Sequence, residues 1–242
     1  MGGSFFTGIR HLLVGLKLLS KPGIRIFVLI PLAINVLLFA LSIYILNHYF
    51  GLWMEQLLGW LPDWLSFIES VLWLIFAILV LVIVAFGFTV LANLIAAPFN
   101  GFLSEAVERY LSGQEPQQSA RSLVAEISRS LWRELAKLRY YLPRVLGLVV
   151  LGFIPVINSV SPVLWALFGV WMMAIQYLDY PMDSNGVEFP AMRERLGQRR
   201  LTTLGFGSSV LLATLVPVLN WFVMPAAVAG ATALWVREYK KV

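Results

Sequence analysis

The chain contains no cysteine, and its two histidines, His11 and His48, lie far apart in the sequence. The absence of cysteine excludes disulfides, thiolate nucleophiles and cysteine-based metal sites. The histidines do not have the HExxH spacing of zinc hydrolases, and the sequence has no G-x-S-x-G motif, P-loop or dinucleotide-binding glycine pattern. We therefore expect no metal site and no cofactor, and the sequence does not indicate an enzyme.

Charged residues are also scarce, because they make up 13% of the 242 residues, whereas about 25% is usual for a soluble domain. Hydrophobic residues make up 60%, and the mean hydropathy is +0.81. Nine tryptophans and eight tyrosines are available for aromatic belts at the membrane surfaces. This composition predicts an all-α integral membrane protein that forms a single membrane domain over residues 1–242.

Two long segments without charge have the length of a membrane-spanning helix. A helix needs about 20 apolar residues to cross a hydrocarbon core of about 30 Å. We therefore expect transmembrane helices at about 27–47 and 70–97, with Pro98 stopping or kinking the second. The segment between them, residues 47–69, carries three tryptophans and is expected to be a loop at the membrane interface.

Helical periodicity with basic residues marks the surface segments. Residues 1–22 have leucines at helical spacing, and residues 99–112 and 121–142 also combine apolar stripes with charged positions. These segments predict amphipathic helices on the membrane surface. RNA binding by the basic segment 121–142 is not favoured, because the tendency of positive charge to stay on the cytoplasmic side already explains its composition.

Two further uncharged segments each contain the pattern Pro-Val-x-Asn near their centre. They predict helical hairpins at about 144–178 and 203–236. A turn at the pattern leaves arms of about 15 residues, or roughly 22 Å, which is short of the hydrocarbon core. We favour re-entrant hairpins that enter the membrane only partly, with the asparagine side chains bonding freed backbone groups at the tips. Short hairpins that cross fully remain the alternative.

The distribution of basic residues predicts the orientation of the chain. None of the 18 lysines and arginines falls between residues 26 and 108. With two spans and two hairpins that return to their own side, every basic segment lies on one side of the membrane. The positive-inside tendency makes that side cytoplasmic, with both chain ends on it.

A candidate anion site precedes the first predicted span. Gly23, Ile24 and Arg25 lie where the free N–H groups of a helix N-terminus and a guanidinium converge, and arginine offers paired donors suited to a tetrahedral oxyanion. The alternative is an interfacial arginine that reaches for lipid phosphate. Further polar residues are candidates for a translocation pathway, with a solvated ion pair as the alternative for the charged ones: Asn93, Asn100, Glu105, Glu108, Arg109, Asn158 and Asn220.

Three segments carry a resemblance to a known family. They are PGIRIFVLIPLAIN (22–35), NLIAAPFNGFLSEAVE (93–108) and AIQYLDYPMDSNGVEFPAMRERL (174–196). Together with the paired hairpins and the length, they resemble the CysZ family of bacterial sulfate permeases. The resemblance implies an inner-membrane homo-oligomer, with hexamers described, that imports sulfate for cysteine biosynthesis.

The resemblance also bears on the site residues. The family's sulfate-binding motif, Gly-Leu-Arg with a frequent second arginine, corresponds to Gly23, Ile24 and Arg25, with Ile26 in place of the second arginine. The family's acidic and basic pair corresponds to Glu105 and Arg109, with Glu108 as a further candidate. Sulfite and thiosulfate are further candidate anions.

The expected function is therefore sulfate transport without ATP hydrolysis. A channel-like route is favoured over proton coupling, because the predicted spans contain no acidic residue. The alternative function is a non-transporting scaffold or a membrane-shaping protein whose hairpins wedge one leaflet.

Overall fold

The computed structural model describes residues 4–60, 69–114 and 123–240, and these residues form helices and turns with no strand among them. The predicted all-α class is confirmed. The chain divides into two compact units, one made of residues 1–28 and 98–242 and the other of residues 29–97.

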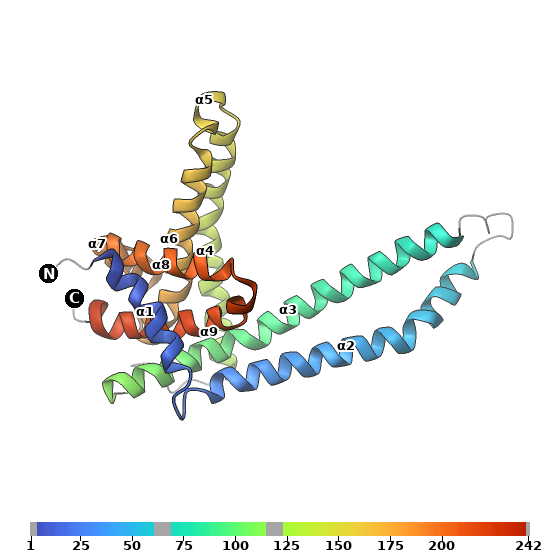
Figure 1. Ribbon diagram of the computed structural model, residues 1–242, viewed down its shortest axis with the longest axis horizontal. Helices are drawn as coiled ribbons and strands as arrows, with labels where there is room; N and C mark the ends of the chain where they lie inside the picture. The colour runs from blue at the N-terminus through green and yellow to red at the C-terminus, as the bar shows by residue number, and fades with distance from the viewer. Residues whose placement is uncertain (1–3, 61–68, 115–122, 241–242) are drawn as a thin grey trace. The chain divides into compact units, whose positions relative to one another are not determined.

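The unit of residues 29–97 is an antiparallel pair of helices (Figure 1). It contains most of α2 (Ile26–Leu58) and the first part of α3 (Glu69–Ser112). Edge-to-face aromatic contacts join the two helices, with ring centroids 5.8 Å apart for Phe39 and Phe88 and 5.6 Å apart for Phe50 and Trp73. Most of the other large side chains on α2 and α3 are exposed, as expected for helices that face lipid.

Two helices are longer than expected. Residues 47–58 continue α2 instead of forming an interfacial loop, and α3 continues through Pro98 instead of breaking into helices at 70–97 and 99–112. A proline inside a helix removes only one N–H donor, and a gentle bend accommodates its ring. The remainder of the expected loop, residues 61–68, lies outside the described residues.

The other unit contains two helical hairpins. The first consists of α4 (Leu123–Gly152), the short α5 (Pro155–Asn158) and α6 (Ser161–Ser184), and Figure 1 shows α5 at its tip. After α7 (Phe189–Gln198), the second hairpin consists of α8 (Arg200–Thr214) and α9 (Pro217–Leu234), followed by the π-helical turn η2 (Trp235–Tyr239). The amphipathic segment expected at 121–142 and the first hairpin arm form one helix, α4, which continues through Pro143.

Both Pro-Val-x-Asn patterns lie at hairpin turns, as predicted. Pro155 is the first residue of α5, and Pro217 is the first residue of α9. Proline is well suited to this position, because the N–H group of the first helical residue has no partner within the helix and the ring fixes a helical φ. Pro155 therefore begins the short helix at the tip of the first hairpin, and Pro217 begins the returning helix of the second.

The helix lengths differ between the two hairpins. Helices α8 and α9 have 15 and 18 residues, or about 22 and 27 Å, which agrees with short arms. Helix α6 has 24 residues, or about 36 Å, and is long enough to cross a membrane. Together with parts of α2 and α3, α6 is one of three segments in the described chain with the length and composition of a span.

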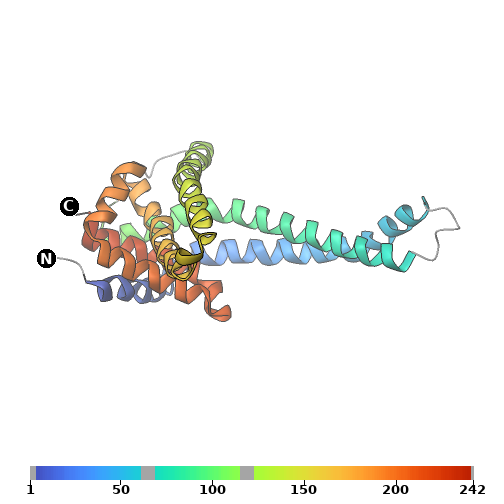
Figure 2. The ribbon, with the colours of Figure 1, turned by 90° about the horizontal axis from the view of Figure 1, so that it is seen from above.

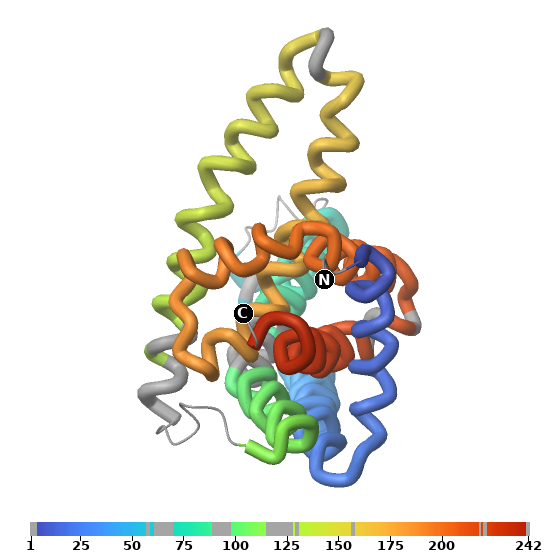
Figure 3. Tube along the Cα trace, turned by 90° about the vertical axis from the view of Figure 1, so that its left-hand side faces the viewer, coloured from blue at the N-terminus to red at the C-terminus, as the bar shows by residue number. Residues whose placement is uncertain are grey.

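Helix α1 (Phe5–Leu18) lies along the second hairpin (Figures 2 and 3). Its buried face repeats at helical spacing and consists of Gly8, His11, Gly15 and Leu18. Gly8 lies against the backbone of Thr202 in α8, and Gly15 against the backbone of Ala226 in α9. Because these glycines lack a side chain, the helix backbones approach closely.

Candidate functional site

The candidate anion-binding turn lies between α1 and α2. Gly23 has a φ of 85°, in the left-handed region that glycine adopts without steric cost, and open space surrounds its Cα. A residue with a side chain would therefore be strained here by its backbone conformation and not by crowding. The first residue of the predicted motif is explained by the shape of the turn.

The next two residues of the turn point in different directions. The Ile24 side chain is 1% exposed and belongs to the hydrophobic core of its unit, so it anchors the turn. Arg25 is exposed, and no carboxylate in the described part of the chain forms an ion pair with it. Its guanidinium is free to meet a ligand from solution.

The backbone amides of the turn differ from the expectation. The N–H groups of Ile24 and Arg25 both donate to the carbonyl oxygen of Lys21, at 3.1 and 3.2 Å, so they are not free for an anion. Among the described residues, the N–H groups of Gly23 and Ile26 have no such acceptor. These two amides, the N-terminus of α2 and the Arg25 guanidinium are the groups that could hold an oxyanion.

A buried polar stripe runs along the end of α3. Asn100, Ser104 and Glu108 are spaced four residues apart, so they lie on one face of the helix, and all are less than a tenth exposed. Glu108, which is fully buried, accepts hydrogen bonds from Asn185 Nδ2 at 2.7 Å and from Lys240 Nζ at 2.8 Å. Asn100 and Glu108 were expected as pathway residues, and the structure places them on the same face.

Partners on α6 and α9 complete this stripe. Asn100 Nδ2 donates to the Tyr180 hydroxyl at 3.3 Å and to the Met224 sulfur at 3.6 Å. Ser104 Oγ and Thr232 Oγ1 share a hydrogen bond of 2.9 Å. Ser104 was not among the predicted pathway residues, although its spacing from Asn100 and Glu108 in the sequence indicates the same helix face. Since each group has a partner, the stripe joins α3 to the hairpins.

The other predicted pathway residues are dispersed. Glu105 is partly buried and Arg109 is exposed, and each interacts with another residue. Asn158 lies at the tip of the first hairpin with its side chain exposed, and it forms no side-chain hydrogen bond within the described chain. The expected bonding of freed backbone groups by Asn158 is therefore not found. Asn93 and Asn220 are helical, and their side chains lie outside the described part of the structure.

An ionic cluster between α4 and α6 was also missed. Arg133 bridges Asp179 and Asp183 with distances of 2.8 Å, and Lys137 Nζ lies 3.0 Å from Asp179 Oδ2. The Lys137 and Asp179 side chains are only 2% and 6% exposed. Arg133 and Lys137 are four residues apart, as are Asp179 and Asp183, and this matched spacing was the signal in the sequence.

The cluster keeps its buried lysine charged. Burial of Lys137 disfavours the ammonium form, but the carboxylates of Asp179 and Glu134 outweigh this effect and raise the pKa of the side chain. Gln176 adds an amide oxygen 3.3 Å from Lys137 Nζ. The cluster fixes the register of α4 against α6 at the base of the first hairpin.

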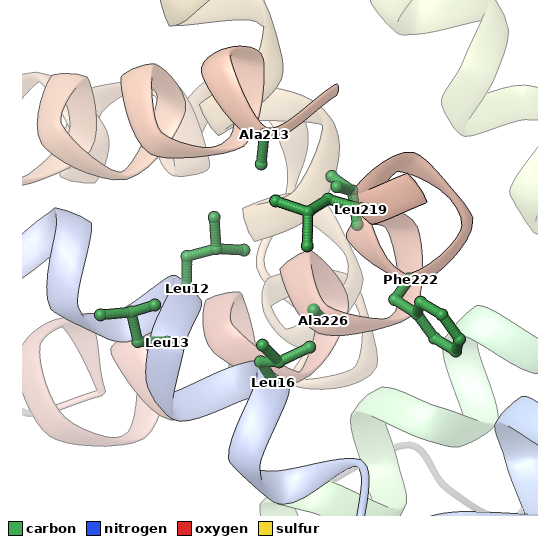
Figure 4. A pocket seen from close by; sticks show the side chains of 8 residues that line it. Leu12, Leu13, Leu16, Ala213, Leu219, Phe222 and Ala226 are labelled. Carbon is green, nitrogen blue, oxygen red and sulfur yellow. The ribbon is translucent and has the colours of Figure 1, made fainter. Parts of the chain in front are cut away.

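An apolar groove lies between α1 and the second hairpin. Leu12, Leu13 and Leu16 of α1 line it together with Leu219 and Phe222 of α9 (Figure 4), and the groove has a volume of about 130 Å³. Its wall is completed by Ala213, Val223 and Ala226. Since all the described side chains of this wall are apolar, they offer no group that binds a doubly charged anion.

The comparisons with known proteins give the family. A family model described as sulfate transporter CysZ/etoposide-induced protein 2.4 matches residues 11–225. The chain belongs to this family. A relative from Pseudomonas fluorescens is 52% identical over 98% of this chain and 96% of its own length. Its printed name is sulfate transporter CysZ.

Other members of the CysZ family are similarly close. Relatives from Pseudomonas syringae pv. tomato and Pseudomonas aeruginosa are 53% and 50% identical, each over 96% of this chain, and cover 92% and 95% of their own lengths. Both carry the same printed name. Together with the apolar helices, family membership identifies the chain as a membrane protein.

Proposed function

We propose that the protein transports sulfate across the bacterial inner membrane into the cytoplasm. The imported sulfate supplies the sulfur for cysteine biosynthesis. The observation that carries the proposal is the similarity to relatives named sulfate transporter CysZ, which extends over nearly the whole chain. A membrane-shaping scaffold is not favoured, because the family is named for transport and the similarity is not confined to the hairpins.

Sulfate first meets the turn between α1 and α2. The exposed Arg25 guanidinium supplies paired donors, and the amides of Gly23 and Ile26 supply two more. Ile24 contributes as the buried anchor of the turn. The pathway continues past the polar end of α3, where Asn100, Glu105, Glu108 and Arg109 lie, and the hairpin residues Asn158 and Asn220 remain candidates, as does Asn93.

The transport is channel-like and needs no ATP. Residues 27–47 and 70–97 contain no acidic or basic side chain, whereas proton-coupled carriers use ionisable groups within the membrane. Sulfite and thiosulfate share the tetrahedral shape or the charge of sulfate, and they are competing ligands in this proposal. The functional assembly is a homo-oligomer, in which the exposed apolar faces of α2 and α3 contact lipid and neighbouring copies.

Sulfate uptake into liposomes tests the proposal. Proteoliposomes with the wild-type chain should take up radiolabelled sulfate faster than empty vesicles. Arg25→Ala should weaken sulfate binding at least about tenfold, because a charge-assisted hydrogen bond contributes roughly 1.5–3 kcal/mol. Arg10→Ala, which removes an exposed arginine of α1, is the matched control and should leave binding unchanged.

A second variant introduces the second arginine of the family motif at position 26. Ile26 is half exposed beside Arg25, so Ile26→Arg supplies a second guanidinium and should tighten sulfate binding. Uptake no faster than in empty vesicles would reject transport. Unchanged binding in both Arg25→Ala and Ile26→Arg would reject the site and leave transport to another route.

A further inference from the structure

Two arginines from different helices converge on one tyrosine ring. The guanidinium carbon of Arg144 in α4 lies 3.6 Å from the centroid of the Tyr140 ring, and that of Arg193 in α7 lies 4.8 Å from the same centroid. Phe189 adds a second aromatic wall, with its ring 5.8 Å from Tyr140 and 5.3 Å from the Arg193 guanidinium. Two positive charges therefore lie beside one aromatic pair.

Among the described residues, no carboxylate forms an ion pair with Arg144 or Arg193. Other cations of the same unit are paired, for example Arg199 with Glu238 and Lys240 with Glu108. The Nε–H of Arg193 is also buried and has no acceptor in the described part of the chain. A buried N–H donor without an acceptor is costly unless a ligand satisfies it.

The surroundings hold the groups in place. Trp171 Nε1 donates to the Tyr140 hydroxyl at 3.3 Å, which fixes the ring from the side of α6. Arg144 donates to the Tyr140 carbonyl oxygen at 2.8 Å, which fixes the base of its guanidinium. The Arg144 side chain is otherwise exposed to solvent. A ligand at this position meets donors that are already ordered.

We propose that Arg144 and Arg193 bind a tetrahedral oxyanion beside the Tyr140 ring, as a site separate from the turn at Gly23–Arg25. Each guanidinium presents a planar fork of donors to such an anion, and two of them neutralise a dianion. Free sulfate and the phosphate of a lipid headgroup have this chemistry. Both can reach the site, because Arg144 is the last charged residue before the uncharged segment 145–178.

Binding measurements test this site independently of transport. They are made on purified, delipidated protein in phosphate-free buffer, in an Arg25→Ala background, so that failure of the first site does not affect the result. Adding Arg144→Gln and Arg193→Gln should reduce residual radiolabelled sulfate binding at least about tenfold. Arg139→Gln is the matched control, because Arg139 is an exposed arginine of α4 with no recorded contact to the Tyr140 ring.

Native mass spectrometry of protein purified from membranes tests the lipid source. Loss of bound phospholipid in the double variant, with sulfate binding unchanged, would support the site and assign it to a headgroup. Loss of sulfate binding alone would assign it to the free anion. Retention of both ligands at wild-type levels by the folded double variant, shown by an unchanged melting temperature, would overturn the proposal.

Discussion

His11 lies in the contact between α1 and the second hairpin, where its ring is 4% exposed. Its Nδ1 donates to the carbonyl oxygen of Thr7 at 2.7 Å, and its Nε2 is buried without a partner. Burial lowers the pKa of His11 and the charges of Arg237 and Arg10 act in the same direction, although the Thr7 bond and Glu238 oppose them. The imidazole is therefore neutral in the folded chain.

This lowered pKa makes stability depend on pH. The unfolded chain binds a proton near the ordinary value of 6.5, whereas the folded chain does so only at a lower pH. The free energy of unfolding should therefore fall as pH decreases below about 6.5, by about 1.4 kcal/mol for each unit of lowered pKa. His11→Asn keeps an N–H donor for the carbonyl oxygen of Thr7 but cannot titrate. The melting temperature of this variant should therefore depend less on pH between about 7.5 and 5 than that of the wild type. An equally steep curve in the variant would show that another group titrates.

Asp179 contacts both cations of the ionic cluster. Replacing it with asparagine removes the negative charge that holds Arg133 and Lys137 in a buried position. We expect Asp179→Asn to lower the free energy of unfolding by about 3 kcal/mol, measured as a loss of thermal stability in detergent. Glu134→Gln is the control, because the Glu134 side chain is 51% exposed and its pair should contribute less than about 1 kcal/mol. Equal effects of the two variants would contradict this account.

Some features of single residues follow from the local sequence, whereas the anion site proposed at Gly23–Arg25 stays a prediction. Gly23 and Arg25 were proposed because they precede a long apolar helix, and the structure adds that Gly23 has the left-handed conformation that glycine tolerates. The ionic cluster could not be assigned in the same way. Arg133 and Asp179 are 46 positions apart, and their pairing depends on how α4 packs against α6. A basic amphipathic segment looks the same whether its charges face water or a buried carboxylate.

At the scale of helices, close backbone contacts determine which elements pack together. Gly205 of α8 lies against the backbone of Phe5 in α1, and Gly207 lies against the backbone of Val170 in α6. Gly205 and Gly207 therefore form a helix-packing surface on α8. The prolines show the limit of sequence reasoning at this scale. Pro155 and Pro217 mark turns, whereas Pro98 and Pro143 lie inside continuous helices, because long flanking helices outweigh one lost hydrogen bond.

A valine at Gly205 should detach α1 from α8. Its side chain would overlap the carbonyl group of Phe5, and backbone cannot move aside as a flexible side chain would. Overpacking of this kind typically costs about 1–3 kcal/mol. Hydrogen–deuterium exchange of residues 5–18 should become faster in Gly205→Val. Gly147→Val is the control, because Gly147 is a helical glycine in α4 with no neighbour near the added atom. Unchanged exchange in Gly205→Val would show that α1 docks by other contacts.

At the scale of the whole molecule, the depth of the hairpins in the membrane distinguishes a re-entrant from a fully crossing arrangement. The sequence predicted two hairpins and their turning points, and the structure contains both. The depth to which a hairpin enters depends on how the bilayer surrounds it, and helix length alone does not determine this. Helices α8 and α9 suit partial entry, whereas α6 is long enough to cross. We propose that both hairpins are re-entrant and that both chain ends are cytoplasmic.

The lack of native cysteine makes this topology directly testable. Single cysteines at the hairpin tips, Phe153→Cys and Leu215→Cys, replace side chains that are 83% and 71% exposed in the structure. An impermeant maleimide should label neither tip from either side, because each lies within the bilayer. Trp60→Cys, between α2 and α3, should react from outside, and Gly197→Cys in α7 from the cytoplasm. Labelling of Phe153→Cys from outside would establish a first hairpin that crosses fully.

The packing of α1 against α8 and α9 also has a consequence for biosynthesis. The ribosome completes α1 about 200 residues before it completes the hairpin that covers its glycine face. At about 5–20 residues per second, this interval lasts roughly 10–40 s. During this interval Gly8 and Gly15 of the nascent α1 have no helix packed against them. A truncated transcript that ends before α8 would therefore leave α1 without its docking partner.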